Sequence, residues 1–190
     1  LLVFFLLLEY VCCNVESKCV KGCDVALASY YVSPHLSLEN IKRLMESSID
    51  VIISFNKDKI VNGFPLSFYR LNIPFPCGCI DGEFLGHVFE YSASAGDTYD
   101  SIAKVTYANL TTVELLRRFN SYDQNGIPAN ATVNVTVNCF CGNSQVSEDY
   151  GMFITYPLRP GNNLHDIANE ARLDAKLLQN YNPDVNFSKE

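Results

Sequence analysis

The chain has 190 residues, a formal net charge of −7 at pH 7 and a pI near 4.9. Nearly half of the residues (48%) are hydrophobic and 18% are charged, which is the composition of a folded globular protein rather than a disordered one. The acidic balance argues against nucleic acid or an anionic membrane surface as the partner, because both are bound through clustered Lys and Arg side chains.

The first fifteen residues are typical of a secretory signal peptide. The run LLVFFLLL is apolar but too short to span a bilayer, and polar Glu16-Ser17-Lys18 follows it closely. An initiator Met and a basic n-region are both missing, so we expect residues 1–15 to be part of a signal peptide in a chain that begins as a fragment. A buried N-terminal strand or helix is the alternative.

Cysteine usage after this leader points to an oxidising compartment. Six cysteines remain, and an even number in a secreted chain predicts three disulfides. They are Cys19, Cys23, Cys77, Cys79, Cys139 and Cys141. Zinc is the competing interpretation, but the sulfurs are spread along the chain and no His lies close to them in sequence. We therefore expect no metal site.

N-glycosylation sequons support the same compartment. Four are present, at Asn109, Asn130, Asn134 and Asn186. One sequon can arise by chance, but four that follow a leader form a consistent set. The sequence therefore predicts an extracellular glycoprotein.

An internal repeat recurs at a period of a little over sixty residues. A helix-like run ends in an aromatic-Asn pair three times, at Phe55-Asn56, Phe119-Asn120 and Tyr181-Asn182. The two Cys-x-Cys pairs lie between consecutive copies. The three copies span residues 24–76, 86–138 and 151–190.

The middle copy shows the internal pattern most clearly. Residues 87–93 read as a half-buried strand, and Asp97 or Thr98 then caps a short helix. Thr111 or Thr112 starts a second helix, and residues 132–139 alternate as a return strand. The apolar residues expected to face inward are Tyr99, Ile102, Ala103, Tyr107, Val113, Leu115, Leu116 and Phe119.

The flanking copies follow the same order less regularly. In the first, residues 24–33 serve as the strand, 37–47 and 48–56 as the helices, and 66–75 as the return strand. In the third, residues 151–158 form the strand and 163–172 and 174–182 the helices, after which we expect no return strand and hence no hairpin partner. The predicted fold class is therefore α+β, with three tandem β-α-α-β repeats.

These features together resemble a known family. The strings that carry the resemblance are CVKGCDVALASYY, FPCGCIDGEFLGHVFEY, YANLTT, VNCFCG and TYPLRPG. With the Cys-x3-Cys, the two Cys-x-Cys pairs and the three repeats, they resemble the ectodomain of plant LysM receptor kinases, which recognise chitin oligosaccharides and lipochitooligosaccharide symbiotic signals (Nod factors). The resemblance covers essentially everything after the leader.

The resemblance implies a disulfide pattern that spacing leaves open, because six cysteines allow fifteen pairings. Carried over residue by residue, the pattern joins Cys19 to Cys79, Cys23 to Cys141 and Cys77 to Cys139. Such crossing bonds would clamp the three repeats into one body.

The resemblance also implies a glycan-binding groove in the middle repeat, between two loops. One loop contains Ala95, Gly96, Asp97, Thr98, Tyr99 and Asp100, and the other contains Gln124, Asn125, Gly126 and Ile127, with Val113 nearby. Exposed backbone groups suit acetamido and hydroxyl groups, while Ile127 and Val113 offer apolar surface to an acetyl methyl. The chain has no Trp for stacking on a sugar ring, so affinity would come from many modest contacts.

For the whole protein, the resemblance implies a plasma-membrane receptor whose ectodomain is not an enzyme. Its ligand would be chitin or a lipochitooligosaccharide, its partner a co-receptor LysM kinase, and no cofactor is expected in this chain. The membrane segment and a serine/threonine kinase would lie outside it.

Two alternatives remain open. One is a lipid-anchored LysM protein without a kinase, and the other is a secreted chitin-acting hydrolase. For a hydrolase the candidate carboxylate pairs are Asp81 with Glu83 and Glu148 with Asp149, although solvated loops explain both pairs.

Overall fold

A computed structural model describes residues 19, 21–123, 126–141 and 152–187. The expected signal peptide and the Glu148-Asp149 pair lie outside the described residues. The elements of the first repeat are β1 (Cys23–Tyr31), α1 (Leu38–Leu44), α2 (Ile49–Phe55), β2 (Ile60–Val61), β3 (Phe64–Pro65) and β4 (Arg70–Ile80). The second contains β5 (Phe84–Ser92), α3 (Tyr99–Ser101), the π-helix η1 (Ile102–Thr106), α4 (Val113–Phe119) and β6 (Thr132–Asn138). The third contains β7 (Ile154–Thr155), α5 (Leu164–Ala171) and α6 (Ala175–Tyr181).

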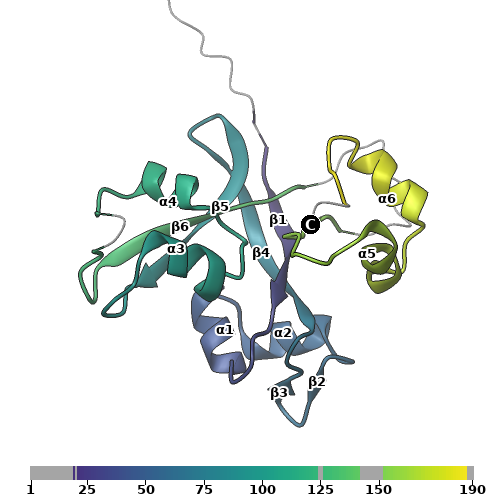
Figure 1. Ribbon diagram of the computed structural model, residues 1–190, viewed down its shortest axis with the longest axis horizontal. Coiled ribbons are helices and arrows are strands. Elements are labelled where there is room, and N and C mark those ends of the chain that lie inside the picture. The colour runs from purple at the N-terminus through teal and green to yellow at the C-terminus, as the bar shows by residue number, and fades with distance from the viewer. Residues whose placement is uncertain (1–18, 20, 124–125, 142–151, 188–190) are drawn as a thin grey trace, which may run out of the picture.

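One five-stranded sheet, in the order β6-β5-β4-β1-β7, runs through all three repeats (Figure 1). The first two repeats are joined by a hairpin between β4 and β5. The hairpin lies at Asp81 and Glu83, where the sequence predicts a solvated loop. Asp81 and Gly82 both have positive φ, 50° and 72°, and the Glu83 N–H donates to the Ile80 carbonyl at 2.9 Å. Asp-Gly is a pair that favours a turn with positive φ at both central residues. The repeats therefore share strands rather than a flexible linker.

The third repeat joins the sheet differently from the other two. Its strand is much shorter than the expected residues 151–158, and it pairs in parallel with β1, with Leu27 opposite Ile154 and Ala28 opposite Thr155. The sheet thus gives β7 a partner in the first repeat instead of the hairpin partner that a return strand would supply.

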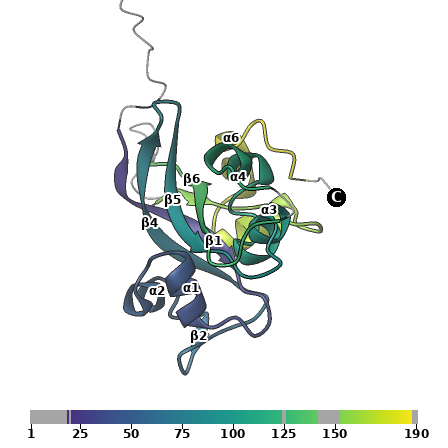
Figure 2. The ribbon, with the colours of Figure 1, turned by 90° about the vertical axis from the view of Figure 1, so that its left-hand side faces the viewer.

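The helices begin where capping residues predict. They form separate pairs around the sheet (Figure 1), and Figure 2 shows the α1–α2 pair apart from the other helices. Thr98 and Thr112 accept hydrogen bonds from Ser101 N–H and Leu115 N–H, so each is the N-cap of its helix. Of the inward residues expected in the second repeat, Tyr99, Ile102, Ala103, Tyr107 and Leu116 are buried, which confirms the predicted face. Val113, Leu115 and Phe119 are half-buried.

The recurring Asn after the second helix ties that helix to the return strand. The Asn56 side-chain amide donates to the carbonyls of Ile52 and Asn72, and its Oδ1 accepts from Asn72 N–H at 2.8 Å. Asn120 makes the same three contacts, with Leu116 and Asn134. The repeat marker seen in the sequence is therefore a structural bridge.

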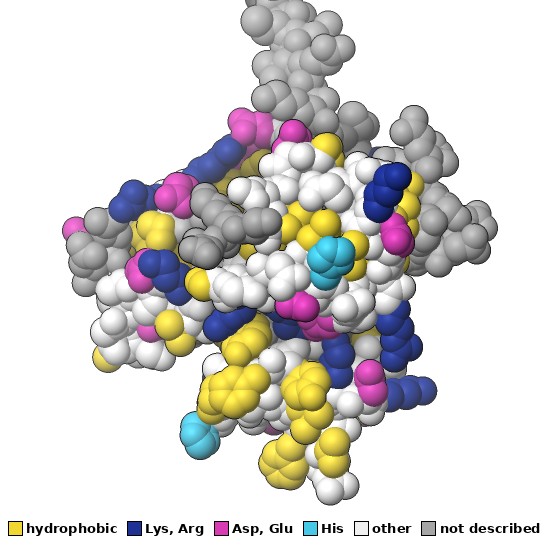
Figure 3. Space-filling view, turned by 45° about the vertical axis from the view of Figure 1, so that its right-hand side comes forward, with side chains coloured by type: hydrophobic (Ala, Val, Ile, Leu, Met, Phe, Trp, Pro, Cys, Tyr) yellow, Lys and Arg dark blue, Asp and Glu magenta, His cyan; other side chains and the backbone are white. Residues whose placement is uncertain are grey.

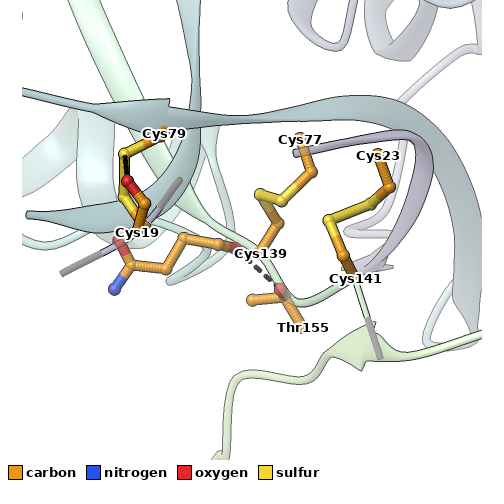
Figure 4. Close-up of a disulfide and its surroundings, with 8 residues drawn as sticks. Cys19, Cys23, Cys77, Cys79, Cys139, Cys141 and Thr155 are labelled. Atoms are coloured by element: carbon orange, nitrogen blue, oxygen red, sulfur yellow. Dashed lines mark hydrogen bonds between the residues drawn. A yellow bond between two sulfur atoms is a disulfide. The ribbon is translucent and has the colours of Figure 1, made fainter. Parts of the chain in front are cut away.

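Three disulfides join the repeats (Figure 4). They connect Cys19 to Cys79, Cys23 to Cys141 and Cys77 to Cys139, the pairing that the resemblance implies. The last two bonds link the first repeat to the segment after β6. Close by, the Thr155 hydroxyl of β7 donates to the Asn138 carbonyl at 2.7 Å. The disulfides thus hold the first repeat to the segment after β6, and the Thr155 hydrogen bond ties β7 of the third repeat to the end of β6.

A cluster of cations and aromatic rings joins the first repeat to the third. The guanidinium of Arg70, which is only 4% exposed, donates to the carbonyls of Ser29 and Pro157. It lies 4.0 Å from the centre of the Tyr156 ring, and the Tyr156 hydroxyl donates to Glu170 at 3.0 Å. Removing the guanidinium from water lowers its pKa. We call Arg70, Tyr156 and Glu170 the inter-repeat joint.

Candidate functional site

The two loops expected to hold a glycan lie side by side at the end of the β5–β6 pair. The Ala93 N–H donates to the Ala131 carbonyl at 2.9 Å, and the Asn130 N–H donates to the Ala93 carbonyl at 2.7 Å. Ser92 at the end of β5 is opposite Thr132 at the start of β6. The first loop follows β5 and the second precedes β6, so both lie at the same edge of this strand pair. The structure therefore joins the chain segments next to the two predicted loops.

The first loop is a tight turn that exposes Ala95, Gly96 and Asp100. Gly96 has a φ of 89°, which L side chains adopt rarely, so glycine is the residue that the turn requires. The Asp97 carboxylate accepts hydrogen bonds from the Ser94 N–H and the Tyr91 hydroxyl, both at 2.7 Å. Asp97 is therefore engaged in holding the turn.

Tyr99 and Asp100 face different environments. Tyr99 is 1% exposed, and its hydroxyl donates to the Tyr122 carbonyl, just before the second loop, at 3.3 Å. Burial raises the pKa of this hydroxyl, so it remains a donor at neutral pH. Asp100 is exposed and pairs with Lys104 at 2.6 Å. Tyr99 thus connects the first loop to the segment before the second loop from the buried side, while Asp100 lies at the surface.

The second loop offers less apolar surface than its sequence suggests. Ile127 is only 4% exposed and belongs to the hydrophobic core, and Val113 is half-buried against that core. Gly126 is exposed, and a Cβ placed there would meet no atom within 4 Å. Gln124 and Asn125 lie outside the described residues. The exposed part of this loop is therefore mainly backbone.

Sequence reasoning missed one aromatic residue at this edge. Tyr122 is 36% exposed, and its hydroxyl donates to the Thr132 carbonyl at 3.2 Å. Its ring is a partly exposed apolar surface beside the loops, in a chain without Trp. The sequence feature that could have identified Tyr122 is its position as the aromatic residue in the loop between α4 and β6.

The carboxylate pair considered for a hydrolase has a structural role. Asp81 and Glu83 both face Arg118 of α4, at 3.8 and 2.9 Å, and the guanidinium lies over the rings of Phe84 and Phe119. This arrangement fastens the β4–β5 hairpin to α4. Both carboxylates remain more than half exposed, as a solvated loop would leave them.

The cysteines also form a compact group of sulfurs. The Sγ atoms of Cys23, Cys77 and Cys141 lie within 4.8 Å of one another. All three are bonded in disulfides, whereas metal ligation requires the thiolate. The chemistry of this donor set is therefore that of a structural clamp.

A hollow lies away from the loops, between the first and third repeats. It has a volume of about 530 Å³, and its lining includes Ile154 of β7, Ile167 of α5, and Leu178 and Tyr181 of α6. In the first two repeats α2 and α4 pack against the return strands β4 and β6. The described part of the third repeat has no such strand. We therefore interpret the hollow as the open core of that repeat and not as the glycan site.

Comparisons with known proteins agree with this architecture. Residues 84–137 match the family model described as the LYK3/4/5 LysM2 domain, and residues 154–190 match a LysM domain model. The chain is 58% identical to LysM domain receptor-like kinase 3 of Medicago truncatula over 99% of this chain and 32% of that protein. It is 46% identical to chitin elicitor receptor kinase 1 of Arabidopsis thaliana over 92% of this chain and 30% of that protein.

A solved structure of a relative has the same fold. The crystal structure of the LYK3 ectodomain superposes with a TM-score of 0.84 at 58% identity, over 90% of this chain and 87% of that one. Fold and disulfides thus define a disulfide-clamped protein with LysM domains. The chain belongs to the family of LysM receptor-kinase ectodomains. It spans about a third of the length of the curated relatives that it matches.

Proposed function

We propose that this chain is the extracellular, carbohydrate-binding part of a plant receptor kinase, and that it recognises N-acetylglucosamine oligomers in the middle repeat. The observation that carries the proposal is the hydrogen bonding of Ala93 to Asn130 and Ala131, which joins the strand ends next to the Ala95–Asp100 and Gly126–Ile127 loops, within residues that match a LysM2 domain model. Their exposed backbone can pair with acetamido and hydroxyl groups. Tyr122 offers a ring face to a sugar.

Chitin oligosaccharides and lipochitooligosaccharides are the two ligand classes in this proposal, for immune or symbiotic signalling. A relative named as a chitin elicitor receptor kinase supports the first class. Ligand binding would alter association with a co-receptor LysM kinase, and a kinase outside this chain would transmit the signal. No helix in the described residues is long and apolar enough to cross a membrane.

Calorimetric titration of the ectodomain with both ligand classes tests the proposal. Gly126→Leu is the diagnostic variant, because its side chain would enter open space above the loop without meeting protein atoms. We expect it to weaken binding at least tenfold at an unchanged melting temperature. Ser54→Leu, at an exposed position on α2 of the first repeat, is the matched control. No heat of binding with either ligand class would refute the proposal.

The residues that follow this chain test the receptor-kinase part of the proposal separately. A transmembrane run followed by kinase motifs supports it, and phosphorylation of a test protein by the whole protein would demonstrate the activity. A small-residue anchor signal in that place would instead identify a lipid-anchored glycan-binding protein.

A further inference from the structure

Two buried tyrosine hydroxyls bond the first and second repeats to each other. The Tyr30 hydroxyl of β1 donates to the Thr106 carbonyl of η1 at 2.6 Å. The Tyr107 hydroxyl, directly after η1, donates to the Leu44 carbonyl of α1 at 3.2 Å, and Figure 1 shows α1 beneath the helical segment that begins with α3. Leu44 and Thr106 are the last residues of their helices, and the last carbonyls of a helix have no partner within it. Each repeat therefore satisfies a helix end of the other.

This link lies inside the molecule. Tyr30 and Tyr107 are 1% and 0% exposed, and the buried apolar side chains of the first two repeats form one hydrophobic cluster. Burial raises the pKa of both hydroxyls, so both remain donors at neutral pH. The first repeat also exposes hydrophobic side chains, but these gather around the β2–β3 hairpin, at the lower end of the view in Figure 3. Removing one buried hydroxyl therefore alters the link and leaves the surface of the first repeat as it is.

Contacts continue from Tyr107 to the first loop of the proposed glycan site. The Tyr107 ring lies edge-on to the Tyr91 ring, with the ring centres 6.1 Å apart, an arrangement that aromatic rings prefer. The Tyr91 hydroxyl donates to the Asp97 carboxylate at 2.7 Å, and the same carboxylate oxygen accepts the Ser94 N–H. A chain of direct contacts therefore leads from α1 of the first repeat to the turn that forms the first loop.

The backbone between the first loop and Tyr107 is unusual. The Tyr107 N–H donates to the Ile102 carbonyl at 2.9 Å, five residues earlier, which makes η1 a π turn of the kind often found at functional sites. Ala108 and Asn109 follow with φ of 50° and 65°, a region that residues other than glycine adopt uncommonly. Such a segment persists only when the surrounding structure holds it. The Tyr30 and Tyr107 bonds supply part of that support from the first repeat.

We propose that Tyr107 and Tyr91 are positioning residues for the first loop, and that through them the first repeat controls how strongly the second repeat binds its glycan. The inference rests on the proposed function, because it assigns the support of the site proposed there. Neither tyrosine has to touch the ligand. Each keeps the loop in the conformation that binds, and a protein that populates its binding conformation only in part has a correspondingly lower affinity. Beside Tyr91, the Glu90 N–H donates to the Glu46 carboxylate at 3.1 Å, so β5 is also bonded to the first repeat at this point.

Tyr107→Phe and Tyr91→Phe test the inference, because each removes one hydroxyl and keeps the ring. Amide hydrogen exchange needs no ligand and reports on the loop directly. We expect exchange at the Ser94 and Asp97 N–H groups, which are bonded within the turn, to become about threefold to tenfold faster in both variants, a larger change than in β6. Calorimetric titration with chitin oligomers and lipochitooligosaccharides should show affinities that are weaker by about the same factor.

A matched control and a double variant separate positioning from a general loss of stability. Tyr156→Phe also removes one tyrosine hydroxyl, which donates to Glu170, but it does so in the third repeat. It should leave the loop exchange and the affinity unchanged. Tyr107→Phe combined with Tyr91→Phe should weaken binding by less than the product of the two single effects, because both residues act on the same loop.

Three results would overturn the inference. One is wild-type loop exchange in Tyr107→Phe, and another is an equal loss of affinity in Tyr156→Phe. The third is glycan binding that Tyr107→Phe and Tyr91→Phe leave unchanged, which would refute this inference and leave the proposed function standing. No heat from the wild-type protein with either ligand class would instead refute the proposed function, and this inference with it.

Discussion

Asn56 and Asn120 show how a single residue can define a repeat. Each side chain spans from the last turn of a helix to the return strand and satisfies backbone groups on both. The sequence reveals the recurrence of Asn but not its role, because the strand partners Asn72 and Asn134 lie sixteen and fourteen residues further along the chain. Only the folded strand brings them within reach.

Replacing Asn120 by Ala should destabilise the second repeat substantially. The change removes three hydrogen bonds and leaves the backbone groups of Leu116 and Asn134 without these partners, so we expect a loss of about 2–3 kcal/mol in the free energy of unfolding. Urea unfolding followed by circular dichroism measures it. Asn180→Ala, at an exposed position on α6, should change stability by less than about 0.5 kcal/mol. Equal effects at the two positions would contradict the bridging role.

The four sequon asparagines are all exposed, including Asn134 on β6. We therefore expect each of them to carry a glycan when the protein is secreted from eukaryotic cells. Peptide mapping after enzymatic deglycosylation in heavy-oxygen water should show conversion to Asp at all four positions. An unmodified Asn134 would indicate that β6 folds before this site can be modified.

The candidate site shows what residue patterns can and cannot predict. The resemblance named both loops, and the structure shows that Ala93, beside the first loop, is hydrogen-bonded to Asn130 and Ala131, which follow the second. The resemblance did not reveal which side-chain groups are exposed. Ile127 packs in the core, and the Asp97 carboxylate accepts hydrogen bonds from Tyr91 and Ser94. Those orientations depend on packing between residues of β5, the two loops and α4, which sequence spacing does not specify.

At the scale of elements, helix positions followed directly from capping residues and apolar spacing, whereas several strands did not. The β2–β3 hairpin was missed although Asn62-Gly63 is a strong turn signal between its strands. Asp81-Gly82 gave the same signal for β4–β5. The short β7 depends on pairing with β1, which is over a hundred residues earlier in the chain. Non-local pairing of this kind leaves little trace in local sequence.

The inter-repeat joint should control how firmly the third repeat is docked, because β7 contributes only a two-residue pairing. Arg70→Met removes the hydrogen bonds to the carbonyls of Ser29 and Pro157. We expect amide hydrogen exchange in α5 and α6 to become at least tenfold faster, while β6 exchanges as before. Arg70→Lys should rescue only partly, since an ammonium group lacks the planar fork that bonds two carbonyls while stacked on a ring.

A uniform increase in exchange across all three repeats of Arg70→Met would contradict this local role. Lys104→Met, which removes an exposed ion pair with Asp100 in the second repeat, is the control and should leave exchange in α5 and α6 unaltered.

For the whole molecule, the disulfides provide much of the restraint that short elements cannot. The bond between Cys23 and Cys141 closes a sequence separation of 118 residues, and constraining the unfolded chain in this way contributes about 4–5 kcal/mol. Replacing both cysteines by Ser should therefore lower the melting temperature markedly. Glycan binding below that temperature should persist, because the loops depend on β5 and β6. Calorimetry and ligand titration measure the two effects, and loss of binding in a folded variant would contradict the separation.

The order in which the cysteines are synthesised allows a wrong disulfide to form during folding. Cys23 and Cys77 are direct partners across the β1–β4 pair, yet neither is the other's disulfide partner. While the chain is being made, the first repeat can fold before Cys139 and Cys141 exist, so the two opposed thiols then face each other while the final disulfide partners of both are missing. Oxidation at that stage would trap the wrong bond. Secretion of this protein should therefore depend on a disulfide isomerase, and correct folding on the second repeat arriving before oxidation is complete.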